Sequence, residues 1–436
     1  MKEILRKLEA IAAGNKKEKR KLMLEYMLDP DFSKFMIYCL DESKTFNVTR
    51  VAMKNSVEGE FYTHTNFYDK LDELNIKGSA TKADKEELAA LGSQSPEHLE
   101  VLNKILRKNP DCGFSAKSMH AILPGVIPYY PYQRCSTDKE LDRIFKDNNL
   151  AFSELKADGM FIRTIVTPKG VTYQTRNGKT LDFLGVPDRY FLDYIREDAV
   201  AVEGEAVVLN KQLTALLPRA ESNAIVTKFM GGYGSKEEAA RIRFQVWNML
   251  PLEEYRDGYC DIPVERRRRI VQIRFADNPI VTPIENRVIH SKEEAWEHYA
   301  EVRSRPTPLE GTVVKAPNEI WKDRKSLLMA KLKSCKQAEV IIIGWEKGKA
   351  GGKNENRLGS FIVESSCGKL KGKCSGMSDA IRDEDPDTWI GRIITVEFNA
   401  VSKHKSFDHA RFIEWRQDKS EADDLEYILK VKSVRK

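Results

Sequence analysis

The chain has 436 residues, of which 41% are hydrophobic and 32% charged, and 72 basic against 66 acidic residues give it a net charge of +6. This length suggests about two to four domains rather than one core. No stretch approaches the roughly 20 apolar residues of a membrane span or has the pattern of a signal peptide. The seven scattered cysteines form no C-x-x-C pair, which argues against a zinc site and a disulfide framework. We therefore expect a cytoplasmic protein with no membrane association, whose basic surface permits a polyanionic partner.

Residues 1–125 are predicted to form a helical domain. Ile4, Leu8 and Ile11 recur at helical spacing, and Ser95 before Pro96 predicts the N-cap of a further helix. The basic run 16–21 has two interpretations, a solvated helix face or a set of phosphate contacts.

A proline-rich break at 124–131 predicts a domain boundary, after which the pattern changes to a multi-domain α+β chain. For residues 126–334 we expect antiparallel sheets, with strands at 161–166, 200–209, 244–250 and 311–315 and helices at 264–275 and 292–304. For residues 335–436 we expect a small closed β-barrel, with strands at 340–344, 359–364 and 393–397.

The segment Glu154-Leu155-Lys156-Ala157-Asp158-Gly159 contains a K-x-D-G tetrapeptide, which chance would supply in about one chain in ten of this length. Its context makes it informative, because it opens a predicted strand and five further patterns follow in order. These are Thr175-Arg176-Asn177-Gly178, Val202-Glu203-Gly204-Glu205, Phe244-Gln245-Val246-Trp247-Asn248, Glu310-Gly311-Thr312-Val313-Val314-Lys315 and Lys331-Leu332-Lys333. Arg416-Gln417-Asp418-Lys419 stands near the end.

These residue types suit the transfer of a nucleotide to a lysine. The amine of Lys156 must be neutral to attack phosphorus, and nearby cations favour that form. Glu205 and Glu310 offer the oxygen ligands that Mg²⁺ prefers. Lys331 and Lys333 lie on one face of a strand because side chains alternate, and Trp247 could stack on a purine.

The ordered set resembles the covalent nucleotidyltransferases, which comprise DNA ligases, RNA ligases and mRNA capping enzymes, over roughly residues 150–420. The resemblance implies that Lys156 carries AMP and that Glu154 reads the adenine amino group. It further implies an adenine-stacking role for Trp247 and metal binding by Glu205 and Glu310. The remaining implied roles are nucleotide and nick-phosphate contact by Arg176, ribose contact by Glu205, phosphate binding by Lys315, Lys331 and Lys333, and orientation of the leaving pyrophosphate by Arg416, Asp418 and Lys419. Asp158 belongs to the catalytic motif itself.

The chain departs from the family pattern at two positions. Many DNA ligases read K-x-D-G-x-R, and here Phe161 occupies the arginine position while Arg163 lies two residues further on, on the same strand face. Asn248 replaces the usual aspartate after the stacking aromatic, which keeps hydrogen bonding but loses charge. Glu203 also competes with Glu205 for the carboxylate role, and we favour Glu205 because it comes last in the pattern.

The features around this core favour an ATP-dependent DNA ligase. The zinc finger of NAD-dependent ligases is not visible, and a helical region and the Arg416 motif are uncommon in compact RNA ligases. The overall likeness is to the replicative ligases of tailed bacteriophages, which would make the compartment the host cytoplasm. An RNA ligase or capping-type enzyme is the alternative.

The resemblance implies ATP and Mg²⁺ as cofactors, nicked double-stranded DNA as partner, and a monomer with an OB-fold as its C-terminal barrel. We expect the basic run 16–21, the arginines 266–269 and the loop 347–353 to contact DNA phosphates in part, with a solvated helix face as the alternative for 266–269. The sequence does not indicate which clamp or replication protein, if any, recruits the chain.

Overall fold

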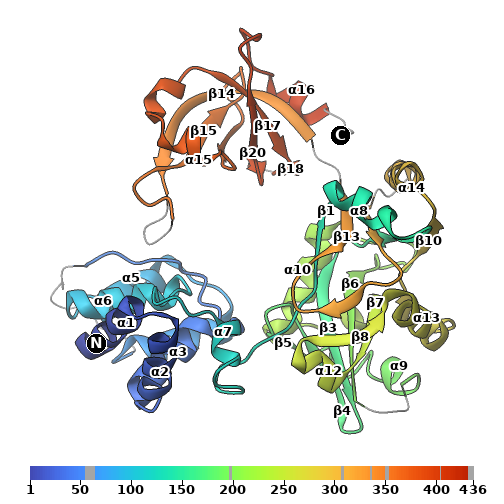
Figure 1. The fold of residues 1–436 in the computed structure, drawn as a ribbon, viewed down its shortest axis with the longest axis horizontal. Coiled ribbons are helices and arrows are strands. Elements are labelled where there is room, and N and C mark those ends of the chain that lie inside the picture. The colour runs from blue at the N-terminus through green and yellow to red at the C-terminus, as the bar shows by residue number, and fades with distance from the viewer. Residues whose placement is uncertain are drawn as a thin grey trace. The chain divides into compact units, whose positions relative to one another are not determined.

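The computed structural model describes residues 1–54, 64–195, 199–305, 309–333, 336–348, 353–402 and 404–430. It divides into two compact units, Met1–Lys331 and Leu332–Lys436 (Figure 1). None of the helices in these ranges is both long enough and apolar enough to cross a membrane.

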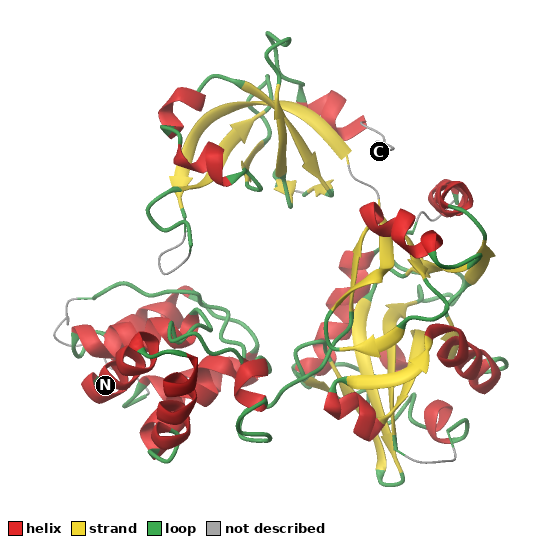
Figure 2. Cartoon of the chain, in the orientation of Figure 1, coloured by secondary structure: helices red, strands yellow, loops and turns green. Residues whose placement is uncertain are grey.

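The first part of the chain is helical, as predicted (Figure 2). Its helices are α1 (Lys2–Ala13), α2 (Lys16–Tyr26), α3 (Pro30–Leu40), α4 (Phe67–Lys77), α5 (Lys82–Gly92), α6 (Pro96–Leu106) and α7 (Ala116–His120). The Ser95 side chain accepts a hydrogen bond from the His98 amide, so the predicted N-cap of α6 is confirmed. The apolar faces of these helices share one buried core, which includes Ile4, Leu8 and Ile11.

Two sheets form the rest of the first unit. The first has the order β1-β13-β11-β2-β10, with β1 (Arg134–Thr137), β2 (Ala151–Lys156), β10 (Asn286–Ile289), β11 (Gly311–Lys315) and β13 (Lys325–Lys333). The second has the order β5-β4-β3-β6-β7-β9, with β3 (Met160–Thr167), β4 (Gly170–Gln174), β5 (Thr180–Leu181), β6 (Val200–Val208), β7 (Ile242–Pro251) and β9 (Val281–Pro283). Within the described residues, β1 pairs with β13 and β7 with β9 in parallel, whereas β2 pairs with β10 and β11, β3 with β4 and β6, β4 with β5, and β6 with β7 in antiparallel fashion. The predicted antiparallel character therefore holds for most of each sheet.

Helices and a short hairpin surround these sheets. The helices are α8 (Leu141–Lys146), α9 (Arg189–Leu192), α10 (Arg219–Met230), α11 (Lys236–Ala240), α12 (Leu252–Asp257), α13 (Val264–Phe275) and α14 (Lys292–Ser304), and β8 (Tyr259–Pro263) pairs with β12 (Ile320–Lys322). The predicted helices 264–275 and 292–304 coincide with α13 and α14, and the predicted strand 311–315 coincides with β11. Phe183, Phe191 and Phe244 pack together over the second sheet and are buried. This core fixes β6 and β7, which contribute to the site.

The second unit contains a five-stranded antiparallel sheet in the order β16-β15-β14-β17-β20. Its strands are β14 (Lys336–Lys347), β15 (Leu358–Glu364), β16 (Lys371–Cys374), β17 (Ile393–Phe398) and β20 (Arg411–Trp415), accompanied by β18 (Ala400–Val401), β19 (Phe407–Asp408), α15 (Asp379–Asp383) and α16 (Leu425–Lys430). The prediction of a closed barrel is wrong, because the sheet is open. Its edges meet, within the described residues, at one isolated parallel bridge between Ser375 and Arg411 rather than along a ladder.

Candidate active site

A pocket lies between the two sheets of the first unit. It holds about 630 Å³ with its open mouth included, which is within the usual range for a small-molecule site. Of the predicted site residues, six line it: Glu154, Lys156, Arg176, Glu205, Trp247 and Lys315. The structure therefore gathers in one place side chains that lie up to 161 positions apart, from Glu154 to Lys315.

Lys156 is the last residue of β2, where it pairs with Gly311 of β11. Its Nζ donates a hydrogen bond of 2.5 Å to Oε2 of Glu310, and both side chains are one-quarter exposed. The tetrapeptide needs a glycine at position 159, because a Cβ there would stand 2.3 Å from the carbonyl oxygen of Ala206. Only a glycine lets the turn after Lys156 pass this close to β6.

Three carboxylates act on one another around Lys156. Burial raises the pKa of Glu205 to about 7, with Glu310 and Asp158 adding to the rise and Lys156 opposing it. Burial also raises the pKa of Asp158, against which Arg219 acts from 3.3 Å. The carboxylates thus form a region of concentrated negative charge beside the amine.

Glu205 and Glu310 are suited to bind a Mg²⁺ ion that the protein and its substrate would hold together. Among the described residues, no group of three or more His, Cys, Asp or Glu side chains is gathered as a metal site. Mg²⁺ is usually held by one or two carboxylates together with substrate phosphates and water. Glu205 and Glu310 fit that donor set.

Glu154 and Lys315 form a buried ion pair within the pocket. They come from β2 and β11, and they are 2% and 6% exposed. In this structure the carboxylate of Glu154 is therefore engaged by a cation. Buried pairs of this kind are sensitive to the loss of either partner, because a charge would remain uncompensated.

Aromatic side chains line the pocket beside Glu205. Trp247 sits at a bulge of β7, where Asn248 pairs with Glu203 and Val246 with Gly204, so that Trp247 itself has no strand partner. Phe161 lies 6.0 Å from Trp247, measured between ring centroids. It occupies the position where the family pattern has arginine, and it extends the aromatic wall.

Arg176 lies over another ring of this wall, with its guanidinium carbon 4.5 Å from the centroid of Tyr132. The turn that carries Arg176 ends at Gly178, which has a φ of +81°. A Cβ at Gly178 would stand 1.9 Å from the ring of Tyr130. The glycine thus permits the turn that holds Arg176 at the pocket.

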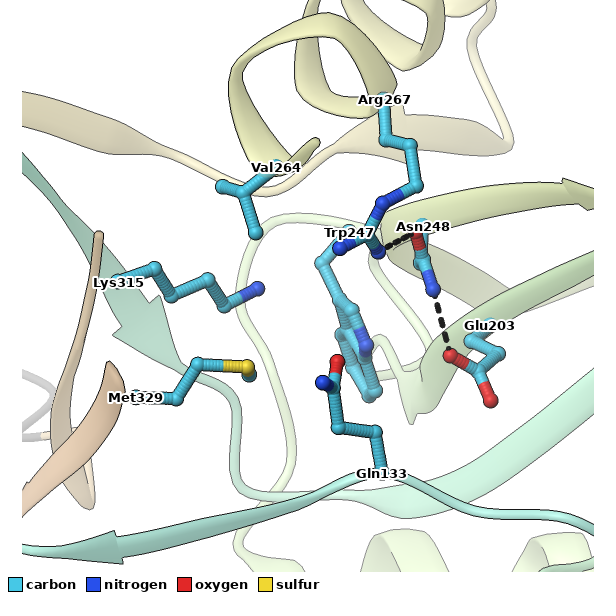
Figure 3. A pocket seen from close by; sticks show the side chains of 8 residues that line it. All are labelled: Gln133, Glu203, Trp247, Asn248, Val264, Arg267, Lys315 and Met329. Atoms are coloured by element: carbon cyan, nitrogen blue, oxygen red, sulfur yellow. Dashed lines mark hydrogen bonds between the residues drawn. The ribbon is translucent and has the colours of Figure 1, made fainter. Parts of the chain in front are cut away.

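A buried polar network stands behind Trp247 (Figure 3). Nδ2 of Asn248 donates to Oε2 of Glu203 at 2.8 Å, and Nη1 of Arg267 donates to Oδ1 of Asn248 at 2.5 Å. Glu203 is 3% exposed and does not line the pocket that contains Lys156. The structure thus favours Glu205 over Glu203 and gives Asn248 a structural role that needs an amide, which donates and accepts at once.

The three segments predicted to contact DNA differ in how exposed their residues are. Arg267 is only 4% exposed, so it is unavailable to phosphate, whereas Arg266 and Arg269 are exposed. The run 16–21 lies in α2 and is mostly exposed. In the loop 347–353, residues 349–352 lie outside the described part of the chain.

Arg163 does not replace the family arginine in the pocket. It is fully buried, donates through Nη2 to the carbonyl oxygen of Pro131 at 3.1 Å, and lies over the ring of Tyr255. Its place is therefore behind the pocket wall.

The remaining lysines and the C-terminal motif belong to different parts of the structure. Lys331 of β13 pairs with Thr137 of β1. Burial raises the pKa of Cys135, a thiol that lines the pocket, and the charges of Lys315 and Lys331 oppose that rise. Both lysines therefore act electrostatically on the pocket. Lys333 falls in the second unit, where its Nζ donates to Asn399 at 3.4 Å.

Arg416, Asp418 and Lys419 also fall in the second unit. Arg416 makes a two-pronged contact with Asp418, at 2.9 and 2.7 Å, and binds Glu339 at 2.6 Å. The structure thus brings the motif together around Glu339, which lies 3.9 Å from Lys419.

Sequence patterns missed several residues that line the pocket, among them Tyr132, Gln133 and Met329. Tyr132 and Gln133 follow the proline-rich break, which carries no periodic signal, and Met329 reads as an ordinary strand residue. Tyr132 joins the pocket wall through a contact distant in sequence, because its ring meets the ring of Phe161 in β3 edge to face.

Comparisons with known proteins match this geometry. Residues 133–333 match the ATP dependent DNA ligase domain, and residues 348–416 match a DNA ligase OB-like domain. The chain therefore carries the domains of an ATP-dependent DNA ligase.

Phage relatives are similar to this chain in sequence, and solved structures are similar to it in fold. The DNA ligases of Enterobacteria phages T4 and T6 are each 25% identical to this ligase, over 76% of its chain and 78% of theirs. A solved structure named Pmar-Lig_Pre has the same fold, with a TM-score of 0.72 and 20% identity over 95% of this chain and 99% of that one. A second structure, Pmar-Lig_PreS3, gives a TM-score of 0.68 with the same coverage.

Proposed function

We propose that this ligase seals nicks between a 3′-hydroxyl and a 5′-phosphate in duplex DNA, with Lys156 as its nucleophile. The observation that carries the proposal is the pocket where Lys156, hydrogen-bonded to Glu310, lies among Glu205, Arg176 and Trp247. It unites a nucleophile, oxygen ligands, a phosphate-binding cation and a stacking surface.

In the first step the amine of Lys156 attacks the α-phosphorus of ATP. An N–P bond forms, the bond from that phosphorus to the bridging oxygen breaks, and pyrophosphate leaves with the electron pair. Oε2 of Glu310 supports the loss of the amine proton because it already accepts a hydrogen bond from Nζ. Mg²⁺, held by Glu205 and Glu310, would neutralise charge on the phosphates.

Two further transfers complete the reaction. An oxygen of the 5′-phosphate at the nick attacks the phosphorus of lysyl-AMP, and the P–N bond breaks to give the DNA-adenylate. The 3′-hydroxyl then attacks the 5′-phosphorus and AMP leaves. Arg176 is a suitable phosphate contact in both steps, because its guanidinium is fixed over Tyr132 at the pocket.

Several finer points belong to the same proposal. We propose domains at 1–125, 126–334 and 335–436, with a monomer acting on nicked DNA in the cytoplasm, the host's if the chain is phage-encoded. Lys331, Lys333, Arg416, Asp418 and Lys419 keep the roles that the family resemblance implies. Asp158 keeps its place in the catalytic motif.

The test is labelling with ATP that carries a radioactive α-phosphate, followed by a chase with nicked duplex DNA. The wild-type chain should retain label on denaturing gels and lose it as the nick is sealed. Lys156→Arg is the matched control for Lys156→Ala, since it keeps a cation near Glu310 but cannot become neutral. Label on either variant would refute Lys156 as the nucleophile.

Parallel reactions separate the alternative functions. Labelling by GTP rather than ATP would favour a capping-type enzyme, and sealing of nicked RNA in preference to nicked DNA would favour an RNA ligase.

A further inference from the structure

Gln133 is a buried amide in the wall of the candidate nucleotide pocket. It is 8% exposed, and it lines the same pocket as Lys156 and Trp247. It also lines a smaller neighbouring pocket that shares Trp247 with the first, and there its side chain extends toward the indole (Figure 3). The amide is therefore placed beside the surface on which a purine would stack.

The orientation of this amide is fixed by its neighbours. Nε2 donates to Oε1 of Glu319 at 3.1 Å and to the carbonyl oxygen of Ile320 at 2.8 Å. Both partners are acceptors, so a flipped amide would set its own oxygen against two oxygens and lose both bonds. The side-chain nitrogen is committed to the protein, and the side-chain oxygen must point the other way.

The side-chain oxygen of Gln133 is available to accept a hydrogen bond from a ligand. Across the described residues, no donor makes a hydrogen bond to Oε1 of Gln133. The nearby carboxylate of Glu154 is by contrast already paired with Lys315. A ligand in this pocket thus meets a neutral, oriented acceptor in Gln133.

We infer that Gln133 reads the adenine base, by accepting a hydrogen bond from its exocyclic amino group. This inference rests on the proposed function, since it requires a nucleotide stacked on Trp247. Adenine presents an amino donor at the position where guanine presents a carbonyl oxygen, so guanine would face an acceptor with an acceptor. A site built around a buried hydrogen-bonding group discriminates strongly against a ligand that leaves it unpaired.

The experiment compares ATP with purine riboside triphosphate, which lacks the amino group. For each nucleotide, kcat/KM for modification of Lys156 is measured by pyrophosphate release in the full-length protein. One hydrogen bond of this kind changes a binding constant by about 3- to 10-fold. We expect the ratio of kcat/KM for ATP to kcat/KM for the analogue to fall by that factor in Gln133→Met, mostly through an increase in the KM for ATP. Discrimination against GTP should fall as well.

Glu154→Gln is the comparison variant, because the family pattern assigns amino-group reading to Glu154. A Gln133→Met ratio equal to that of the wild type, with the ratio lost in Glu154→Gln instead, overturns the inference. Gln133→Leu is a second variant that controls for misfolding. Both Gln133 variants must still react with the analogue, which shows that they are folded, and both must lower the ratio of kcat/KM values. Failure of the wild type to react with any nucleotide would instead refute the proposed function.

Discussion

Arg267 is the residue whose replacement most directly tests how the stacking surface is held. It lies on α13 and donates to Oδ1 of Asn248 at 2.5 Å and to the carbonyl oxygens of Ile262 and Glu319 at 2.8 and 3.2 Å. Asn248 follows the bulge that carries Trp247. Arg267 thus ties α13 to the strand position that presents the indole.

The cost of Arg267→Met follows from these three bonds. A hydrogen bond from a charged donor contributes about 1.5–3 kcal/mol. Burial lowers the pKa of Arg267, which reflects a desolvation cost that offsets part of this gain. Methionine fills much of the volume but removes all three hydrogen bonds, although the carbonyl oxygen of Glu319 keeps the Val264 amide as a donor. We therefore expect β7 to lose roughly 3 kcal/mol of local stability.

Hydrogen exchange measured by mass spectrometry reports this local stability without assuming that the whole chain unfolds at once. Amides of residues 242–251 should exchange roughly 100-fold faster in Arg267→Met, since about 1.4 kcal/mol corresponds to a factor of ten. The KM for ATP should rise as Trp247 loosens. Arg266→Met is the matched control, because Arg266 is exposed on the same helix and should change stability by less than about 0.5 kcal/mol.

Unchanged exchange of β7 in Arg267→Met, or an equal effect in Arg266→Met, would refute the reasoning. An increase in KM without faster exchange would also refute it, because the effect on ATP is argued to act through the strand.

Three further predictions concern the site and the DNA. Gly159→Ala should reduce labelling by ATP at least about tenfold, since its Cβ would meet the Ala206 carbonyl oxygen at 2.3 Å, and normal labelling would contradict the close approach. The raised pKa of Glu205, about 7, means that its carboxyl is mostly protonated at about pH 6 and mostly ionised at about pH 8. The Mg²⁺ concentration for half-maximal labelling should therefore fall as pH rises across this range, and the same slope in Glu205→Gln would exclude Glu205 as its origin. Arg20→Gln, at an exposed position of α2, should flatten the dependence of log affinity for nicked DNA on log salt by about one unit, and an unchanged slope would exclude a phosphate contact there.

The sequence determined the chemistry of the site because that chemistry is carried by residue types in a fixed order. Lys156, Glu205, Trp247 and Lys315 were predicted from their motifs, and all four line one pocket. The strands and helices that carry them were predictable too, since alternation and helical spacing are local properties. The helix at 264–275 was predicted at the bounds that the structure gives.

Only the tertiary structure decided what each member of a pattern does. Arg266 and Arg267 are indistinguishable as neighbours in a basic run, yet one is exposed and the other buried against Asn248. Closure of the C-terminal sheet depends on whether β16 and β20 form a ladder, and they meet at one bridge. Gln133 carries no motif, and its orientation depends on Glu319, which is 186 positions away. Burial and hydrogen-bond direction are set by partners distant in the chain, so no local pattern could have specified them.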